Sequence, residues 1–457
     1  MNEIQGIVRE ESKSGKKLLF AFPRVGSSLV LGMEGFALFT LYWVGFGIPA
    51  FWVALIQAIG FLVIGFSQFF FGWVSDGRYT KWGRRKPYIV ALAPLLGISF
   101  LFLFLPSLIL PDLSDTMMLL IWLFIWDMIF KISYSLTTVY QSWMAEQFKI
   151  SERPKVSQFQ NYFNWIGNGS MAIVSIVVLT GYVDALRGPP PLLPNPNAPI
   201  PFDFLLITIV FGVIAIVSFT LVGLLMPTEP KFEIKSNLKE NLKIVIHNRN
   251  YLRIILMIGI ASLAWSIVTD ALLAYSQAVL FLSDTEFYII AGILIVGIFS
   301  FLFVWRRLLE KLGKKQALLY IFLFSAISLP VSLLALIEAF PRLILGIIFI
   351  VIATGALGGW FLFPYIVYAD VAEDDEKKTG QLKAGVYAGF NSIIANIFQA
   401  FGVFILGTAI ESLPIITLTG ENVALGLIIF GPICTVILLI AYFYTKKFVT
   451  LDFEWEK

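Results

Sequence analysis

The sequence of 457 residues contains one cysteine, Cys434, and one histidine, His247. A disulfide framework needs paired cysteines, and zinc, haem and iron–sulfur sites need several cysteine or histidine ligands. We therefore expect no metal site and no cofactor. The sequence also lacks the Gly-x-x-x-x-Gly-Lys-Ser/Thr motif of phosphate-binding loops, which argues against a self-contained pump driven by ATP.

Charge is the second scarce property. Only 14% of residues are charged, whereas 58% are apolar and the mean hydropathy is +0.84. Soluble domains are about a quarter charged, so a soluble globular protein is excluded. Unbroken apolar runs, without ten-residue alternation, exclude a membrane β-barrel and predict an all-α protein in the lipid bilayer. Twelve segments are long enough to cross it: 18–44, 48–75, 87–106, 117–144, 158–183, 203–226, 251–281, 286–305, 317–338, 342–368, 384–410 and 422–445.

The basic residues predict the orientation of these spans. Twelve spans place both termini on one side, and almost all Lys and Arg residues fall at that side, in the termini and the even-to-odd loops. The exceptions are Arg24 and Lys131 within spans, and Arg187 and Arg342 on the other side. Because cytoplasmic loops are enriched in Lys and Arg, we expect a multi-pass protein of the plasma membrane with both termini cytoplasmic.

The chain also repeats at about half its length. The sequence GRRK at 83–86 follows span 2, and GKKQ at 313–316 follows span 8. Ala-Glu at 145–146 ends span 4, and Ala-Asp at 369–370 ends span 10. The repeat predicts two six-helix bundles in parallel orientation. The expected domains are a cytoplasmic N-terminus (1–17), an N-terminal bundle (18–226), a linker (227–250), a C-terminal bundle (251–445) and a cytoplasmic C-terminus (446–457).

Three segments carry a family resemblance. Residues 72–87 read GWVSDGRYTKWGRRKP, residues 370–381 read DVAEDDEKKTGQ, and a weaker match runs from Ser133 through Glu146 to Gly167. Together they resemble major facilitator transporters and, more narrowly, the glycoside–pentoside–hexuronide:cation symporter family. The resemblance implies the major facilitator fold, with twelve helices in two bundles, and a monomer that binds a small molecule and no nucleic acid.

Charged residues in these loops are candidates for a cytoplasmic gate. Opposite charges at the rim can hold helix ends together in one conformation and must separate in another. The candidates are Asp76, Arg84, Arg85, Asp370 and Glu373. The alternative is that the cations only mark topology.

Ionisable groups within a bilayer are costly and usually functional. The sequence places Glu34 in span 1, Asp127 and Lys131 in span 4, and Asp270 in span 7. Asp127 and Lys131 are four positions apart on one helix face, so they can pair. Such a pair either neutralises itself or binds substrate or a proton.

Amide and aromatic side chains add a candidate sugar site. Hydroxyl groups need hydrogen-bonding partners, and the apolar face of a sugar ring needs an aromatic surface. Amides also join helices to one another, and aromatic residues are often only packed. The candidates are Asn161, Asn164 and Asn168 with neighbouring Trp165 in span 5, Trp360 and Tyr365 in span 10, and Asn391, Asn396 and Gln399 in span 11.

The sequence departs from the family pattern at the cation site. By the resemblance, Gln68 and Ile64 occupy carboxylate positions of helix II, Lys131 a carboxylate position of helix IV, and Ser28 a sugar-contacting carboxylate of helix I. Asn396 stands where the family has a lysine. A sodium site is therefore not preserved. We expect either proton coupling through Glu34 or Asp127, with Lys131 modulating the proton affinity, or uniport without coupling.

The favoured interpretation is a secondary transporter of a sugar or glycoside that works by alternating access. Lys131 leaves open an anionic substrate, such as a hexuronide or a lysophospholipid. A polytopic membrane enzyme is the main alternative of another class, but it would need a cluster of His, Cys or acidic residues at one membrane face. The two-half repeat argues against a channel or a receptor.

Overall fold

The computed structural model describes residues 12–77, 79–149, 152–187, 195–228, 248–379, 384–418 and 420–451. In the N-terminal half the helices are α1 (Ser14–Ala21), α2 (Pro23–Thr40), η2 (Leu41–Gly45), α3 (Ala50–Gly77), α4 (Lys86–Phe104), η3 (Pro106–Leu108), α5 (Thr116–Tyr134), α6 (Leu136–Gln147), α7 (Arg153–Val174), η5 (Ser175–Leu179), α8 (Thr180–Arg187) and α9 (Phe202–Leu225). In the C-terminal half they are α11 (Arg249–Ala278), α12 (Asp284–Leu312), α13 (Lys314–Ser328), η6 (Leu329–Leu336), α14 (Arg342–Thr379), α15 (Ala384–Ser412), α16 (Leu425–Ile428) and α17 (Phe430–Phe448), with strands β1 (Ile415–Leu418) and β2 (Glu421–Ala424).

Several spans consist of consecutive helical pieces. Pro23 starts α2 and separates it from α1, because proline fits the first turn of a helix and has no N–H to continue one. Pro330 is the second residue of the 3₁₀ segment η6, which completes the span of α13. The π-helical turn η2 ends the first span, and η5 interrupts the span that begins with α7.

Within the described residues, eleven helices or helix combinations are long and apolar enough to cross a membrane. Many of their outward side chains are apolar, including Val296 at 67% exposure and Ile327 at 70%, which suits a surface covered by lipid rather than water. We assign α17 as the twelfth span: it has 19 residues and ends on Lys446 and Lys447. The predicted all-α fold with twelve spans is confirmed.

The twelfth span differs from its prediction at its start. The sequence predicts a helix over 422–445, but β1 and β2 form an antiparallel hairpin that ends at Ala424. The short helix α16 follows it, and α17 begins at Phe430. Gly420, at the turn, has φ +85°, a backbone conformation that glycine adopts without strain. The two strands have only four residues each, too few for periodicity to distinguish strand from helix.

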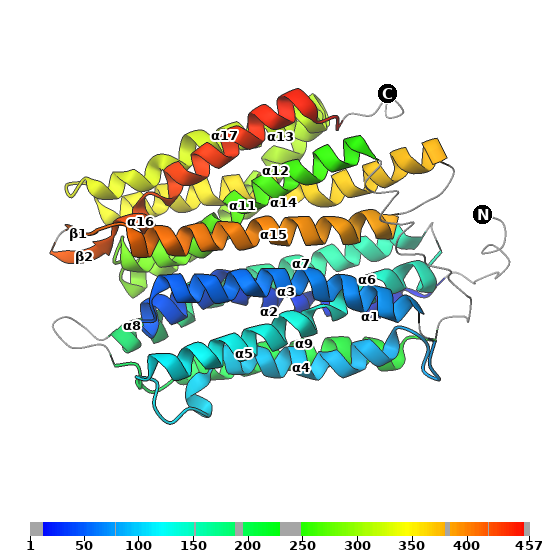
Figure 1. Ribbon diagram of the computed structural model, residues 1–457, viewed down its shortest axis with the longest axis horizontal. Coiled ribbons are helices and arrows are strands. Elements are labelled where there is room, and N and C mark those ends of the chain that lie inside the picture. The colour runs from blue at the N-terminus through cyan, green and yellow to red at the C-terminus, as the bar shows by residue number, and fades with distance from the viewer. Residues whose placement is uncertain are drawn as a thin grey trace.

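The two halves lie one above the other in Figure 1, with α1–α9 in blue to green below and α11–α17 in green to red above. Helices α2 and α11 contact each other across the boundary, and so do α3 and α15. Gly407 of α15 permits a close approach to α3, because a Cβ there would collide with Ala54. The predicted linker lies mostly at 229–247, outside the described residues.

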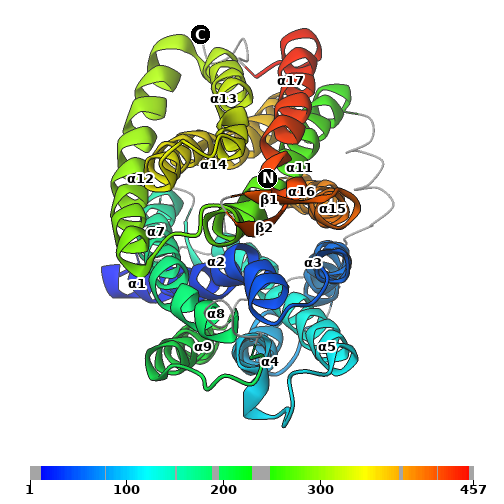
Figure 2. The same cartoon turned by 90° about the vertical axis from the view of Figure 1, so that its left-hand side faces the viewer.

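The helices run between two ends of the molecule. The basic end is where α1 begins and α17 ends, at the right of Figure 1. The opposite end carries the hairpin and α8. Figure 2, which faces the opposite end, shows the hairpin lying near the boundary between the halves.

Candidate functional site

A buried ion pair joins two helices of the N-terminal half. The Nζ atom of Lys131 in α5 lies 2.7 Å from Oε2 of Glu34 in α2, and both side chains are almost fully buried. The ring of Phe61 in α3 lies 4.5 Å from the same Nζ, at the distance of a cation–π contact. The ammonium group is thus stabilised without water. The spacing on α5 suggested Asp127 as its partner, but the hydrogen-bonded partner is Glu34.

Asp127 lies one turn earlier on α5 and is fully buried. Neither of its carboxylate oxygens has a hydrogen-bond partner among the described residues, although Lys131 and Glu34 interact with it electrostatically. A Cβ at Gly60 of α3 would collide with its Oδ2, so the glycine provides the space for the carboxylate. A buried carboxylate without partners is expensive, and such groups are often functional.

Asp270 brings the C-terminal half into this cluster. It lies in α11, is 3% exposed, and interacts electrostatically with Glu34 and Lys131. Its Oδ2 lacks a hydrogen-bond partner in the described part of the chain. We call Glu34, Asp127, Lys131 and Asp270 the charged cluster. It sets three carboxyl groups against one ammonium group, so it can gain or lose a proton without losing its only cation.

The three predicted asparagines of α7 lie in different environments. Asn161 and Asn168 are exposed, whereas Asn164 is half-buried and accepts a hydrogen bond from Ser28 Oγ of α2. Asn164 therefore joins two helices, while the other two amides remain accessible. The neighbouring indole of Trp165 is 46% exposed on the same helix.

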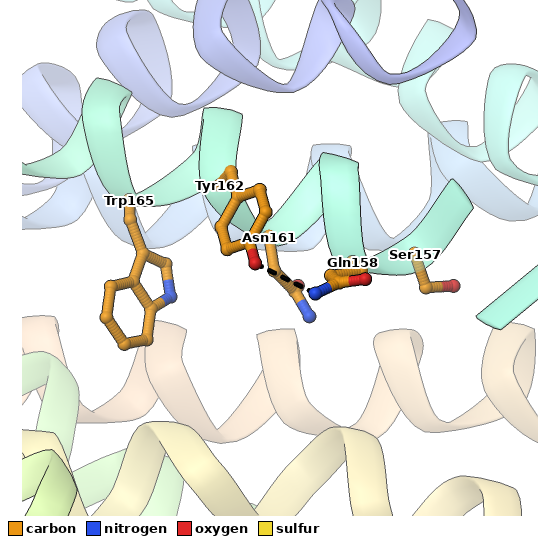
Figure 3. Close-up of a pocket in the computed structure, with 5 residues that line it drawn as sticks. All are labelled: Ser157, Gln158, Asn161, Tyr162 and Trp165. Carbon is orange, nitrogen blue, oxygen red and sulfur yellow. Dashed lines mark hydrogen bonds between the residues drawn. The ribbon is translucent and has the colours of Figure 1, made fainter. Parts of the chain in front are cut away.

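A pocket opens along the part of α7 nearer the basic end. It is lined by Ser157, Gln158, Asn161, Tyr162 and Trp165 and measures about 320 Å³, within the usual range for small-molecule sites. Figure 3 shows these side chains along one length of α7, with helices of the other half across from them. Gln158 Nε2 donates to the Tyr162 hydroxyl at 2.8 Å. The sequence analysis did not single out Ser157, Gln158 and Tyr162. The first two lie about one turn before Asn161 and continue the asparagine face, whereas no spacing rule points to Tyr162.

Trp360 packs inside the C-terminal half. It is 5% exposed and stacks on Trp265 of α11, with ring centroids 6.1 Å apart and an interplanar angle of 28°. The ring of Phe322 also packs near Trp360, with the two ring centroids 6.1 Å apart. A sugar therefore has little access to the Trp360 ring in this conformation. The side chain of Tyr365 lies outside the described residues.

Serine hydroxyls, rather than the predicted amides, donate the hydrogen bonds that join α15 to its neighbours. Asn396 Nδ2 donates to the Ser392 carbonyl at 2.7 Å, and Ser392 Oγ donates to Gln68 of α3. The Gln399 carbonyl accepts a hydrogen bond from Ser266 of α11 at 3.2 Å. Asn391 is buried, and its Oδ1 has no partner among the described residues. These contacts connect α15 to both halves.

At the basic end, the predicted gate arginines converge on one carboxylate. Arg84 and Arg85 bind Glu146 of α6, at N–O distances of 2.8 and 3.0 Å, and Arg85 also donates to Ser75 Oγ at 2.7 Å. All of these groups belong to the N-terminal half. In the sequence, Glu146 stood out only as part of the repeat and of the third resembling segment, not as a gate residue. The backbones of Asp76, Asp370 and Glu373 are helical, but their side chains lie outside the described part of the structure.

Comparison with solved structures identifies the fold. The nucleoside transporter NupG has a TM-score of 0.60 and 13% identity over 94% of this chain and 99% of its own. A D-xylose–proton symporter has a TM-score of 0.61 and 12% identity over 95% and 96%. A bacterial homologue of the lysosomal transporter Spinster, in an inward-facing, occupied conformation, has a TM-score of 0.62 and 14% identity over 94% and 95%. No protein of curated function matches the sequence significantly.

A family model decides the assignment. The model described as MFS/sugar transport protein matches residues 21–446, nearly the whole chain. The chain belongs to this family of major facilitator transporters. The protein is thus a multi-pass membrane transporter of small molecules and not an enzyme. Transporters with internal repeats bind substrate and coupling ions near the bilayer midplane, at the interface of the repeats.

Proposed function

We propose that this chain carries a sugar or glycoside across the membrane by alternating access. The observation that supports this most directly is the α7 pocket. It combines the amides of Gln158 and Asn161 with the exposed rings of Tyr162 and Trp165. Hydrogen-bonding groups beside an accessible aromatic surface suit a polyol, whose hydroxyls need partners and whose ring has an apolar face.

We further propose that protons drive this transport through the charged cluster. Asp127 offers two buried oxygens that have no hydrogen-bond partner in the described part of the chain. Lys131 places a fixed ammonium group where the resemblance implies a cation-binding carboxylate. A proton added to a carboxyl of this cluster relieves repulsion among the three acids. The similar fold of a D-xylose–proton symporter supports this proposal.

An anionic substrate is the weaker alternative. It rests on Lys131 acting as the anion's partner, but the ammonium group already pairs with Glu34 and is fully buried. An anion would have to displace Glu34 from a contact of 2.7 Å. Uniport without coupling is the other alternative, and uptake under ion gradients distinguishes it from coupled transport.

Uptake into proteoliposomes tests the substrate site. A panel of neutral glycosides, uronates and lysolipids is measured with the parent chain and with Trp165→Ala and Asn161→Ala. We expect both variants to lower kcat/KM for a neutral glycoside by on the order of tenfold, since each removes about 1–2 kcal/mol of contact. Ile166→Ala is the matched control, because Ile166 is 58% exposed on the same helix and lies outside the pocket lining. Uptake of uronates or lysolipids alone would contradict the sugar proposal.

The same vesicles test coupling. A pH gradient should drive accumulation by the parent chain, and Asp127→Asn should abolish accumulation while leaving downhill exchange measurable. Accumulation that follows a sodium gradient with no response to pH would refute proton coupling. Equilibration without accumulation under either gradient would support uniport.

We also propose the setting in which the protein works. The accumulation of Lys and Arg at the basic end favours a cytoplasmic location for that end and for both termini. The plasma membrane and a monomeric state fit this arrangement, because each chain contains both halves of the transport path.

A further inference from the structure

The two halves exchange hydrogen bonds at the opposite end of the molecule. Arg187, the last residue of α8, donates from Nη1 to the backbone carbonyl of Gln277 in α11 at 3.4 Å. In return, Gln277 Nε2 donates to the Thr180 carbonyl in α8, also at 3.4 Å. Each half thus supplies one side-chain donor and one backbone acceptor. Gln277 is 2% exposed, so water competes little for these groups.

The carbonyl of Gln277 is one that local structure leaves available. Gln277 precedes the end of α11 at Ala278 by one residue, and the last carbonyls of a helix have no partner within it. A guanidinium group there also interacts favourably with the negative end of the helix dipole. Thr180 is the first residue of α8 and directly follows the π-helical turn η5.

The segment after α11 adds a third contact. The Arg187 guanidinium lies 5.8 Å from the centre of the Phe281 ring. Phe281 has φ +49°, the only positive value at a non-glycine residue in the described chain. Bulky residues rarely adopt this conformation, so the turn is held in place by its surroundings.

The opposite end is therefore closed while the basic end is accessible. At the opposite end, η5 contacts α12 of the other half, and Arg187 and Gln277 connect α8 to α11. Nearer the basic end, the face of α7 that carries Tyr162 and Trp165 is exposed and forms a pocket. This asymmetry is that of a transporter open on one side.

We propose that Arg187 and Gln277 form a latch that keeps the transport path closed at the opposite end and must break in each cycle. The proposal rests on alternating access as proposed above, but not on any particular substrate. Arg342 provides the matched control. It is the other arginine at this end, and its Nη1 donates at 3.0 Å to the Ala335 carbonyl within its own half.

Distances between spin labels test the latch in purified protein without substrate. One pair of cysteines replaces Phe202 and Ile415, which are exposed at the opposite end in different halves. A second pair replaces Lys149 and Gln316, which are exposed at the basic end. The native Cys434 is fully buried, so a chain without added cysteines measures the background.

Arg187→Ala and Gln277→Met should each increase the population with a long opposite-end distance, by roughly three- to tenfold, and shorten the basic-end distance. Arg342→Ala should leave both distributions unchanged. Parent-like distances in Arg187→Ala and Gln277→Met, or an equal shift in Arg342→Ala, would overturn the latch. If Arg187→Ala cannot be purified folded, Gln277→Met decides alone. A shift without glycoside uptake would uphold the latch and reject only the proposed substrate.

Discussion

At the scale of single residues, the burial of Lys131 makes the identity of its ion-pair partner important. Lys131 and Glu34 are at most 2% exposed as side chains, so neither charge is screened by water. The net contribution of such a pair is small, because desolvation offsets attraction, but removing one partner leaves a buried charge uncompensated. The pair is thus better regarded as a fixed charge arrangement than as a source of stability.

Glu34→Gln should therefore be strongly destabilising. We expect the free energy of unfolding to fall by about 3–5 kcal/mol, since the buried ammonium loses its carboxylate. Denaturant unfolding in detergent, followed by tryptophan fluorescence, measures the change. The double variant Glu34→Gln/Lys131→Met should recover most of the loss, as a double-mutant cycle would show. A loss below about 1 kcal/mol would mean that Asp127 takes over the pairing.

At the scale of elements, side chains at helix ends connect segments that are far apart in sequence. Glu152 precedes α7 and binds Lys17 of α1 at 2.9 Å. It also accepts hydrogen bonds from the backbone N–H groups of Ser12 and Lys149, at 2.7 and 3.2 Å. One carboxylate thus holds the start of α1, the end of the α6 connection and the start of α7 together.

The stability contributed by Glu152 should depend on pH. Burial raises the pKa of its carboxyl, but the hydrogen bonds from Lys17, Ser12 and Lys149 outweigh burial and place the pKa below its ordinary value of 4.5. A lowered pKa stabilises the folded protein above pH 4.5, and this contribution is lost as pH falls through the folded pKa. The parent chain should have a higher Tm than Glu152→Gln at pH 7, and the difference should shrink below pH 4.5. A constant difference from pH 7 to pH 3.5 would contradict this account.

At the scale of the whole molecule, the distribution of charge and the accessibility of the transport path both differ between the basic end and the opposite end. The ion pairs formed by Glu146 and Glu152 lie at the basic end, whereas Arg187 and Arg342 lie at the opposite end. The pocket lies nearer the basic end and the latch lies at the opposite end. If the basic end is cytoplasmic, the structure is open to the cytoplasm.

Cysteine labelling in intact cells tests this orientation. A membrane-impermeant maleimide should label Ile415→Cys from outside, because the hairpin lies at the opposite end. Gln316→Cys should react only after the cells are permeabilised. The buried Cys434 should give little background. Labelling of Gln316→Cys in intact cells would reverse the proposed orientation.

Much of this arrangement could be predicted from sequence because it depends on local composition. Apolar runs of sufficient length located the spans, and the motifs at 72–87 and 370–381 pointed to the major facilitator transporters to which the chain belongs. The positions of Glu34, Asp127, Lys131 and Asp270 inside spans were likewise apparent, because charge within an apolar run needs no tertiary information. The hairpin was missed because its strands have only four residues each and β1 lies before the predicted span, in a segment expected to be a loop.

Sequence by itself therefore determined the fold, the number of spans and which polar groups the membrane would enclose. Only the tertiary structure decided their partners: Glu34 for Lys131, Glu146 for Arg84 and Arg85, and Trp265 for Trp360. The reason is physical. Helical spacing relates residues on one helix, but a contact between helices depends on the rotation and depth of each, which the packing of the whole bundle sets.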